Sequence, residues 1–273
     1  IGTDTGGSIR LPSTWNSITG FKPTVNALPG DGIVPLCTSF DAPGPMARSV
    51  EDCALIYAML ADLPDPDFAG ASVKGMHFMV LDGVAFEDAQ EVPVTAFEDA
   101  VTRLAAAGAR ISRIDQPSAR TALARGTPLY APEAYGIWQE VIEARPDRMN
   151  ANILTRFRGG GAMSAADFVA GWQALRKAQA EWAEAVAGFD AVLLPGSLIL
   201  PPDAERLRTD ADYFATQNLL TLRNTRIGNV LGVPGASLPT GVPACGLMVL
   251  GRAHEDLALL HAATAIEAAL GTR

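Results

Sequence analysis

Residues 76–81, Met-His-Phe-Met-Val-Leu, form the short apolar run that decides the fold class. A run of this length next to turn residues is typical of a buried strand. Apolar residues then recur at helical spacing at positions 94, 97, 101 and 104, and Gly108 can end that helix. Residues 111–114 alternate apolar and polar side chains, as a second strand would. This strand-helix-strand order predicts parallel pairing with a right-handed crossover, and hence an α/β fold.

Further elements are expected on both sides of this unit. Ser49-Val50-Glu51-Asp52 and Ser164-Ala165-Ala166-Asp167 match capping boxes, which predict helix starts. The segment 2–45 is rich in Gly, Pro, Ser and Thr and is expected to be dominated by loops. The other expected elements are a helix over 50–61, a helical section over 129–187 with breaks at Pro146 and 159–161, a strand over 191–195, a helix over 212–231, strands near Ala236 and Leu247, and a final helix over 254–270.

The composition fits a globular chain, and we interpret residues 1–273 as one domain. Of the 273 residues, 48% are hydrophobic and 19% are charged, which is enough apolar material for a packed core without a sign of long disorder. The formal net charge is −9. Because phosphate binding needs clustered Lys and Arg, this charge disfavours nucleic acid as a partner.

The cysteines and the chain start bear on location. Cys37, Cys53 and Cys245 are widely spaced and odd in number, which suggests neither a disulfide framework nor a zinc site. Reduced thiols fit a cytoplasmic protein, and no apolar run is long enough to cross a membrane. Ile1 stands directly before a glycine-rich loop without a starting Met or a preceding element. We therefore expect that an N-terminal portion is missing from this sequence.

The glycine-rich loop Thr5-Gly6-Gly7-Ser8 is the candidate for chemistry. Two glycines allow a strained or left-handed backbone and a close approach to a ligand. Converging amides of such a loop suit a phosphate or the oxyanion of an acyl intermediate. A simple tight turn is a third interpretation, and the phosphate alternative lacks the GK[ST] ending of a P-loop. These few residues alone leave the alternatives open.

A longer sequence match distinguishes between these three interpretations of the loop. The run Gly2-Thr3-Asp4-Thr5-Gly6-Gly7-Ser8-Ile9-Arg10-Leu11-Pro12 resembles the signature of the amidase signature family, G-[ST]-D-x-G-G-S-[IV]-R-x-P. The resemblance continues in Gly20-Phe21-Lys22-Pro23-Thr24, in Ser39-Phe40-Asp41 and in the block 44–52. Weaker similarities reach the last third of the chain, at 189–195, 229–232 and 237–241. Most of the chain is therefore covered.

The resemblance implies a hydrolase that cleaves the C–N bond of a carboxylic amide through a serine acyl-enzyme. It implies Ser8 as the nucleophile and the amides of Thr5, Gly6, Gly7 and Ser8 as the oxyanion hole, with Asp4 and Arg10 in supporting roles. The family uses a Ser-Ser-Lys triad, whose bridging serine and lysine lie upstream of the nucleophile and outside this sequence. The implied fold is a mixed, mostly parallel β-sheet flanked by α-helices. No metal and no organic cofactor are implied.

The basic side chains of this sequence are poor substitutes for the absent base. Lys22 belongs to the downstream family block, where a structural bond to loop carbonyls is the favoured interpretation. Lys74 and Lys177 stand in surface-like contexts. His77, His254 and His261 are more readily structural than catalytic. None of these residues is assigned as the base.

The residues that could select a substrate lie in the middle and C-terminal segments. Tyr130, Tyr135, Trp138 and Phe157 could form an apolar acyl pocket, although aromatics at helical spacing belong more often to the core. Arg226 could hold a substrate carboxylate, but a surface ion pair is the preferred interpretation.

Three functions remain open at the level of sequence. The first is a stand-alone amidase acting on a small linear amide. The second is the glutaminase subunit of a tRNA-dependent amidotransferase, and the third is a non-catalytic fragment. The negative net charge of the chain favours the stand-alone amidase. Its expected partner is a small-molecule amide, with neither nucleic acid nor membrane, and a homodimer stays open.

Overall fold

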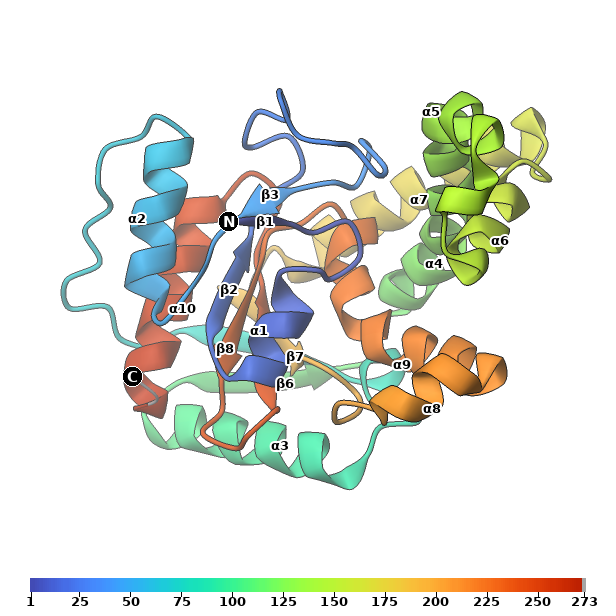
Figure 1. The fold of residues 1–273 in the computed structure, drawn as a ribbon. Coiled ribbons are helices and arrows are strands. Elements are labelled where there is room, and N and C mark those ends of the chain that lie inside the picture. Colours follow the sequence, from blue (N-terminus) through green and yellow to red (C-terminus); the bar gives the residue numbers. More distant parts are fainter. Residues whose placement is uncertain (272–273) are drawn as a thin grey trace.

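The computed structural model describes residues 1–271 and is built around one seven-stranded sheet (Figure 1). A separate two-stranded ladder joins β1 to β3 at the start of the chain. In spatial order the large sheet consists of β4 (Met46–Ala47), β2 (Thr19–Lys22), β8 (Gly235–Pro239), β9 (Gly246–Leu250), β7 (Ala191–Pro195), β5 (His77–Leu81) and β6 (Arg110–Ile114). The small ladder consists of β1 (Gly2–Thr3) and β3 (Pro43–Gly44).

The predicted strand-helix-strand unit is confirmed. Strands β5 and β6 pair in parallel from His77 opposite Arg110 to Leu81 opposite Ile114, and helix α3 (Glu91–Ala106) connects them. Strand β7 pairs in parallel on the other side of β5. The α/β class and these parallel strands therefore follow from the pattern that the sequence shows.

The expectation of a mostly parallel sheet is wrong. The pairings β2 with β4, β2 with β8, β8 with β9 and β7 with β9 are all antiparallel, so the described sheet is mixed and mostly antiparallel. For β8 and β9 the reason is the length of the connection. Only residues 240–245 separate β8 from β9, and a connection that short can join antiparallel strands but cannot make a parallel crossover.

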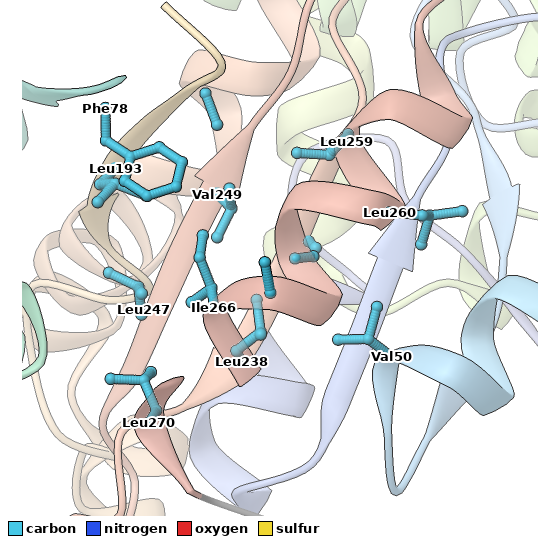
Figure 2. Close-up of a cluster of buried hydrophobic side chains, with 14 of the residues drawn as sticks. Val50, Phe78, Leu193, Leu238, Leu247, Val249, Leu259, Leu260, Ile266 and Leu270 are labelled. Atoms are coloured by element: carbon cyan, nitrogen blue, oxygen red, sulfur yellow. The ribbon is translucent and has the colours of Figure 1, made fainter. Parts of the chain in front are cut away.

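Helices cover both faces of the sheet, and the strands divide their side chains between the two layers. Phe78 and Val80 of β5 point into one apolar cluster, whereas Met79 and Leu81 point into the other. The first cluster is covered by α2 (Val50–Leu60), α3 and α10 (Asp256–Leu270), and Figure 2 shows side chains of α10 against those of β7, β8 and β9. The second cluster is covered by α4 (Pro117–Gly126), α7 (Ala165–Val186) and α9 (Ala211–Val230).

The remaining helices lie outside these layers. Helices α5 (Tyr130–Ala144) and α6 (Ala151–Gly160) pack on each other beside α4 and α7 (Figure 1). Short helical turns are η1 (Gly83–Ala85), η2 (Thr127–Leu129), η3 (Pro146–Arg148) and α8 (Ala204–Thr209). Within residues 1–271, no helix is both long enough and apolar enough to cross a bilayer.

Both predicted capping boxes begin helices as expected. The Ser49 hydroxyl accepts the Asp52 amide at the start of α2, and the Ser164 hydroxyl accepts the Asp167 amide at the start of α7. The prediction of loop over 2–45 missed α1 (Arg10–Asn16) and β2. Helix α1 is a seven-residue helix with Pro12 near its start, too short to show apolar periodicity.

Candidate active site

The candidate nucleophile loop, residues 4–9, connects β1 to α1. Asp4 extends the small ladder, because its amide donates to the Ala42 carbonyl at 2.9 Å and its carbonyl accepts the Ala42 amide at 3.3 Å. The loop ends where the Leu11 amide donates to the Gly7 carbonyl at 2.8 Å, at the first turn of α1. Ser8 lies between these anchors with an exposed side chain. A strand and a helix therefore fix the two ends of the loop.

The buried Asp4 carboxylate stabilises the loop by accepting hydrogen bonds from its backbone amides. It accepts the Gly7 amide at 2.7 Å and the amides of Ile9 and Arg10 at 3.3 Å each. The Arg10 guanidinium donates to both carboxylate oxygens at 3.0 Å. Burial disfavours the ionised carboxylate, but the Arg10 charge and these hydrogen bonds outweigh it, so the pKa of Asp4 falls to about 2.

Helix α9 supplies the third member of this buried cluster. The Asn229 side-chain amide donates to the Asp4 carboxylate at 2.9 Å and to the Asp4 carbonyl at 3.1 Å. Its oxygen accepts Arg10 Nη2 at 2.6 Å. Asp4, Arg10 and Asn229 are each at most 1% exposed. Because hydrogen bonds are stronger in the low dielectric of the protein interior than in water, these bonds fix the geometry of the loop. The structure therefore places Asp4 and Arg10 together, behind the loop.

Gly7 has a backbone that a larger residue would not adopt. Its φ is +135°, and a Cβ at this position would lie 2.2 Å from Thr225 Oγ1. Thr225, on α9, donates its hydroxyl to the Gly6 carbonyl at 2.7 Å. That bond turns the Gly6 carbonyl toward α9. Glycine is needed here for the turn and for the close approach of the helix.

The four amides predicted for the oxyanion hole differ in their partners. The Gly7 amide donates to Asp4 and is therefore occupied. Within residues 1–271, no hydrogen bond engages the amides of Thr5, Gly6 or Ser8. The oxyanion hole stays a prediction, and these three amides are the donors that the loop leaves free for it.

A second loop, residues 36–41, packs against the first. The Thr5 hydroxyl donates to one oxygen of the Asp41 carboxylate. The other oxygen accepts the Leu36 amide at 2.8 Å and the Cys37 amide at 2.9 Å. Asp41 thus fixes residues 36–37 beside Thr5. The sequence matched Asp41 to a family block without giving it a role.

The front of the nucleophile loop faces a cavity of about 600 Å³, within the range of small-molecule sites. Both loops contribute to its wall, and helices α5, α6 and α9 form the rest together with Thr127 of η2. Two arginines line the cavity, but no Asp, Glu, Lys or His does so within the described residues. The lining residues are Thr5, Gly6, Ser8, Leu36, Cys37, Thr127, Tyr130, Ala131, Ala134, Ile153, Arg156, Phe157, Gly159, Asn218, Leu219, Leu222 and Arg226.

The four aromatic candidates separate into two pairs. Tyr130 and Phe157 line the cavity, as the pocket interpretation predicted. Trp138 donates its ring N–H to the Pro35 carbonyl at 2.7 Å, and the Tyr135 hydroxyl donates to Glu143 at 3.1 Å. Tyr135 and Trp138 therefore have structural contacts away from the cavity.

The preferred interpretation of Arg226 as a surface ion pair is wrong. Its side chain is half-buried in the cavity wall, and no carboxylate within residues 1–271 pairs with it. Sequence reasoning also gave no role to Thr225 or Asn229. The polar run 224–226 within an apolar helix was the signal that could have placed them at the site, since polar side chains on a buried helix face need buried partners.

The other candidate bases and nucleophiles lie outside the site or are inert. Lys22 is fully buried and donates Nζ to the Pro23 carbonyl at 2.7 Å, which confirms its structural interpretation. Lys177 is exposed near Glu181, and His77 bonds the Ser112 hydroxyl at 2.8 Å. Cys37 lines the cavity, but burial and then the nearby Glu133 raise the pKa of its thiol, so it stays protonated.

Comparison with known proteins agrees with this geometry. The family model described as Amidase matches residues 1–260. The chain belongs to the amidase signature family. The resemblance that the motif predicted is therefore confirmed, whereas the roles of its individual residues stay predictions.

Individual relatives of this amidase-family chain are named for different activities. It is 31% identical to a 2-amino-5-chloromuconic acid deaminase of Comamonas testosteroni, over 99% of this chain and 60% of the relative. It is 30% identical to a glutamyl-tRNA(Gln) amidotransferase subunit of Pseudothermotoga lettingae, over 98% of this chain and 64% of the relative. A crystal structure of an amidase superposes with a TM-score of 0.86 at 26% identity, over 98% of this chain and 62% of that one. The chain thus spans about three fifths of the length of the relatives it matches.

Proposed function

We propose that this protein hydrolyses the C–N bond of a carboxylic amide, with Ser8 as the nucleophile. The observation that carries the proposal is the placement of Ser8. Its side chain is exposed on the wall of the cavity, and within residues 1–271 its hydroxyl has no hydrogen-bond partner. The adjacent amides of Thr5 and Gly6 are also without partners in that range. A free hydroxyl next to free backbone donors is the arrangement that acyl transfer needs.

The reaction follows from these groups in two steps. Ser8 Oγ adds to the amide carbonyl carbon and gives up its proton, while the carbonyl oxygen becomes an oxyanion that accepts hydrogen bonds from the free amides. The C–N bond then breaks, the nitrogen leaves with a proton as ammonia or an amine, and an acyl ester remains on Ser8. Water cleaves that ester, which releases the carboxylic acid and restores the hydroxyl. Each oxyanion donor of this kind is worth about 3 kcal/mol in other enzymes.

The proton acceptor for Ser8 is the lysine that the family resemblance implies upstream, acting through a bridging serine. The cavity supports this assignment, because no Lys or His within the described residues lines it. Lys22 is excluded by its position, since it is fully buried and its Nζ already bonds a backbone carbonyl. We propose that the upstream segment completes the site over the exposed face of Ser8.

Labelling with a fluorophosphonate tests the nucleophile in the full-length protein. We expect one labelled peptide containing Ser8, and no label on Ser8→Ala. Ser39→Ala is the matched control, since Ser39 is an exposed serine on the neighbouring loop that does not line the cavity, and it should label normally. A protein that takes up no label, or a Ser8→Ala variant that still does, would support the non-catalytic alternative.

The second candidate is the glutaminase activity of an amidotransferase component, which the similarity to such a protein favours. The lining of the cavity argues against it. Free glutamine carries an ammonium group, and no carboxylate among the described lining residues is available to pair with it. Hydrolysis rates for glutamine, malonamide, biuret and an aryl amide distinguish the two candidates. Activity on glutamine alone would favour the amidotransferase component.

A further inference from the structure

The strongest unexplained feature of the cavity is the charge of Arg226. Arg223, one turn earlier on α9, pairs with Asp88 at 3.1 Å. Arg156, also in the cavity wall, donates to the Asn218 side chain at 3.0 Å. Arg226 has neither kind of partner within residues 1–271, although its side chain is half-buried. Because a desolvated charge without a counter-ion is unfavourable, such a group points to a ligand of opposite charge.

Tyr130 presents a second unsatisfied group on the same wall. Its hydroxyl is buried without a hydrogen-bond partner in the described part of the chain. Its ring packs on Phe40 with a centroid distance of 4.3 Å, which fixes its direction. Tyr130 and Arg226 line the same cavity. Burial raises the pKa of Tyr130, and the charge of Arg226 opposes that rise. The hydroxyl is therefore a neutral donor, on a residue that lines the same cavity as the guanidinium.

This pair of donors lies next to the nucleophile loop. A Cβ placed on Gly6 would lie 3.6 Å from Arg226 Cγ and 3.7 Å from its Nε. The Arg226 side chain therefore passes over Gly6, which lines the cavity and whose amide has no hydrogen-bond partner within residues 1–271. Ser8, Tyr130 and Arg226 all line this cavity.

The charge of the cavity contrasts with that of the chain. The chain carries a formal net charge of −9, yet the two charged residues that line the cavity are both arginines, within the described residues. A local positive field in an acidic molecule attracts anionic ligands. Two hydrogen-bond donors, a guanidinium and a hydroxyl, match the two oxygens of a carboxylate.

We infer that Arg226 and the Tyr130 hydroxyl form a carboxylate-binding subsite, so that the preferred substrate is the monoamide of a dicarboxylic acid. The second carboxylate of such a substrate binds this subsite while its amide carbon lies at Ser8. The part of the inference that concerns turnover rests on the proposed amide hydrolysis. The part that concerns anion binding does not.

Matched substrates test the inference in the full-length protein. Succinamate and butanamide have the same carbon chain, but only succinamate carries a terminal carboxylate. We expect kcat/KM to be about 10- to 100-fold higher for succinamate, the range that one charged hydrogen-bonded contact supports. Arg226→Gln should remove this preference, so that kcat/KM for succinamate falls to about that for butanamide. Tyr130→Phe should reduce the preference about tenfold or less, and Arg226→Lys should retain part of it.

Arg223→Gln is the matched control, because Arg223 is on the same helix and does not line the cavity. It should keep the full preference for succinamate. A wild-type protein that hydrolyses both amides equally well, or an Arg226→Gln variant that loses both activities to the same extent, would overturn the subsite. The wild-type ratio alone is decisive even where a variant folds poorly.

Calorimetric binding of succinate separates the subsite from the proposed reaction. We expect succinate to bind the wild-type protein and to bind Arg226→Gln at least tenfold more weakly. If no amide is hydrolysed but succinate binding still depends on Arg226, the proposed function fails and the subsite stands. If amides are hydrolysed but succinate does not bind, the subsite is wrong and the proposed function stands.

Discussion

The Arg10 guanidinium donates to both carboxylate oxygens of Asp4, each at 3.0 Å, with both side chains fully buried. The two residues stand on either side of Ser8 in the sequence. Their pairing closes the nucleophile loop into a ring on its buried side. The Ser8 hydroxyl lies on the opposite side, which faces the cavity. The same pair therefore determines the stability of the loop and the direction of the nucleophile.

Asp4→Asn should strongly destabilise the fold. The substitution keeps the shape of the side chain but leaves the Arg10 charge buried without a counter-ion, a change that typically costs about 3 to 5 kcal/mol. Urea denaturation measures the free energy of unfolding. Asp147→Asn is the control, because Asp147 forms exposed ion pairs with Arg145 and Arg148, and its loss should leave that free energy nearly unchanged. Equal effects of the two substitutions would contradict the role of Asp4.

Stability should fall in acid because of the same carboxylate. Its pKa is about 2 in the folded protein, against an ordinary value of 3.8. The unfolded chain therefore takes up a proton first as the pH falls, so the contribution of Asp4 is complete above pH 4 and is lost toward pH 2. The difference in unfolding free energy between wild type and Asp4→Asn should shrink across this window. A difference that stays constant from pH 5 to pH 2 would exclude this source of acid sensitivity.

Gly7→Ala should destabilise the protein, whereas Gly6→Ala should not. At Gly7 the new Cβ meets Thr225 Oγ1 at 2.2 Å, and the backbone has a φ of +135°. Backbone strain of this kind alone costs about 1 to 3 kcal/mol. At Gly6 the nearest atom to the new Cβ is 3.6 Å away, an ordinary contact. Thermal melting of the two variants side by side is the measurement, and a similar loss in both would show that Thr225 does not constrain the loop.

Asp41→Ala should slow the reaction of Ser8 more than it reduces stability. Asp41 connects Thr5 to residues 36–37, so its loss lets the cavity wall move relative to the nucleophile. Small displacements of a catalytic group reduce rates by up to about 100-fold. The rate of fluorophosphonate labelling should fall about tenfold or more. Asp31→Ala, at an exposed position in the preceding loop, should label at the wild-type rate.

Lys22 should make stability rise between pH 7 and pH 8.5. Burial, and then the charge of Arg10, lower the pKa of Lys22 to about 7 in the folded protein, against 10.5 ordinarily. In this window the unfolded chain holds a proton that the folded chain has released, so raising the pH favours folding. The unfolding free energy of wild type should rise relative to that of Lys22→Met. The exposed Lys74→Met should follow wild type, and a parallel pH course for Lys22→Met would disprove the shift.

Local sequence patterns predicted those parts of the fold that depend on nearby residues. The capping serines Ser49 and Ser164 mark helix starts through bonds that span three residues. The parallel pair β5 and β6 follows from one helix between two apolar runs. The antiparallel half of the sheet does not, because β2 and β8 meet across more than two hundred residues, and no local pattern specifies that pairing. Helix α1 was missed because it is short and most of its residues are buried.

The site was predictable where a motif is contiguous. Asp4 and Arg10 were predicted as supports of the loop from their places beside Ser8, and the structure brings them into contact. The contributions of α9 were not predicted. Asn229 and Thr225 reach the loop only after the chain has folded, and their spacing from Ser8 carries no signal. The interpretation of Arg226 failed for a related reason, since sequence alone cannot distinguish a surface cation from one that faces a cavity.

The contact of Asn229 with Asp4 joins residues 225 positions apart, which has a consequence for protein synthesis. A ribosome adding about 5 to 20 residues per second needs roughly 10 to 45 seconds to translate that interval. During this time the serine has left the ribosome while its loop still lacks the helix that holds it. The orientation of the Ser8 hydroxyl is therefore not yet fixed in the nascent chain. The nucleophile acquires its geometry only when the last third of this sequence has emerged.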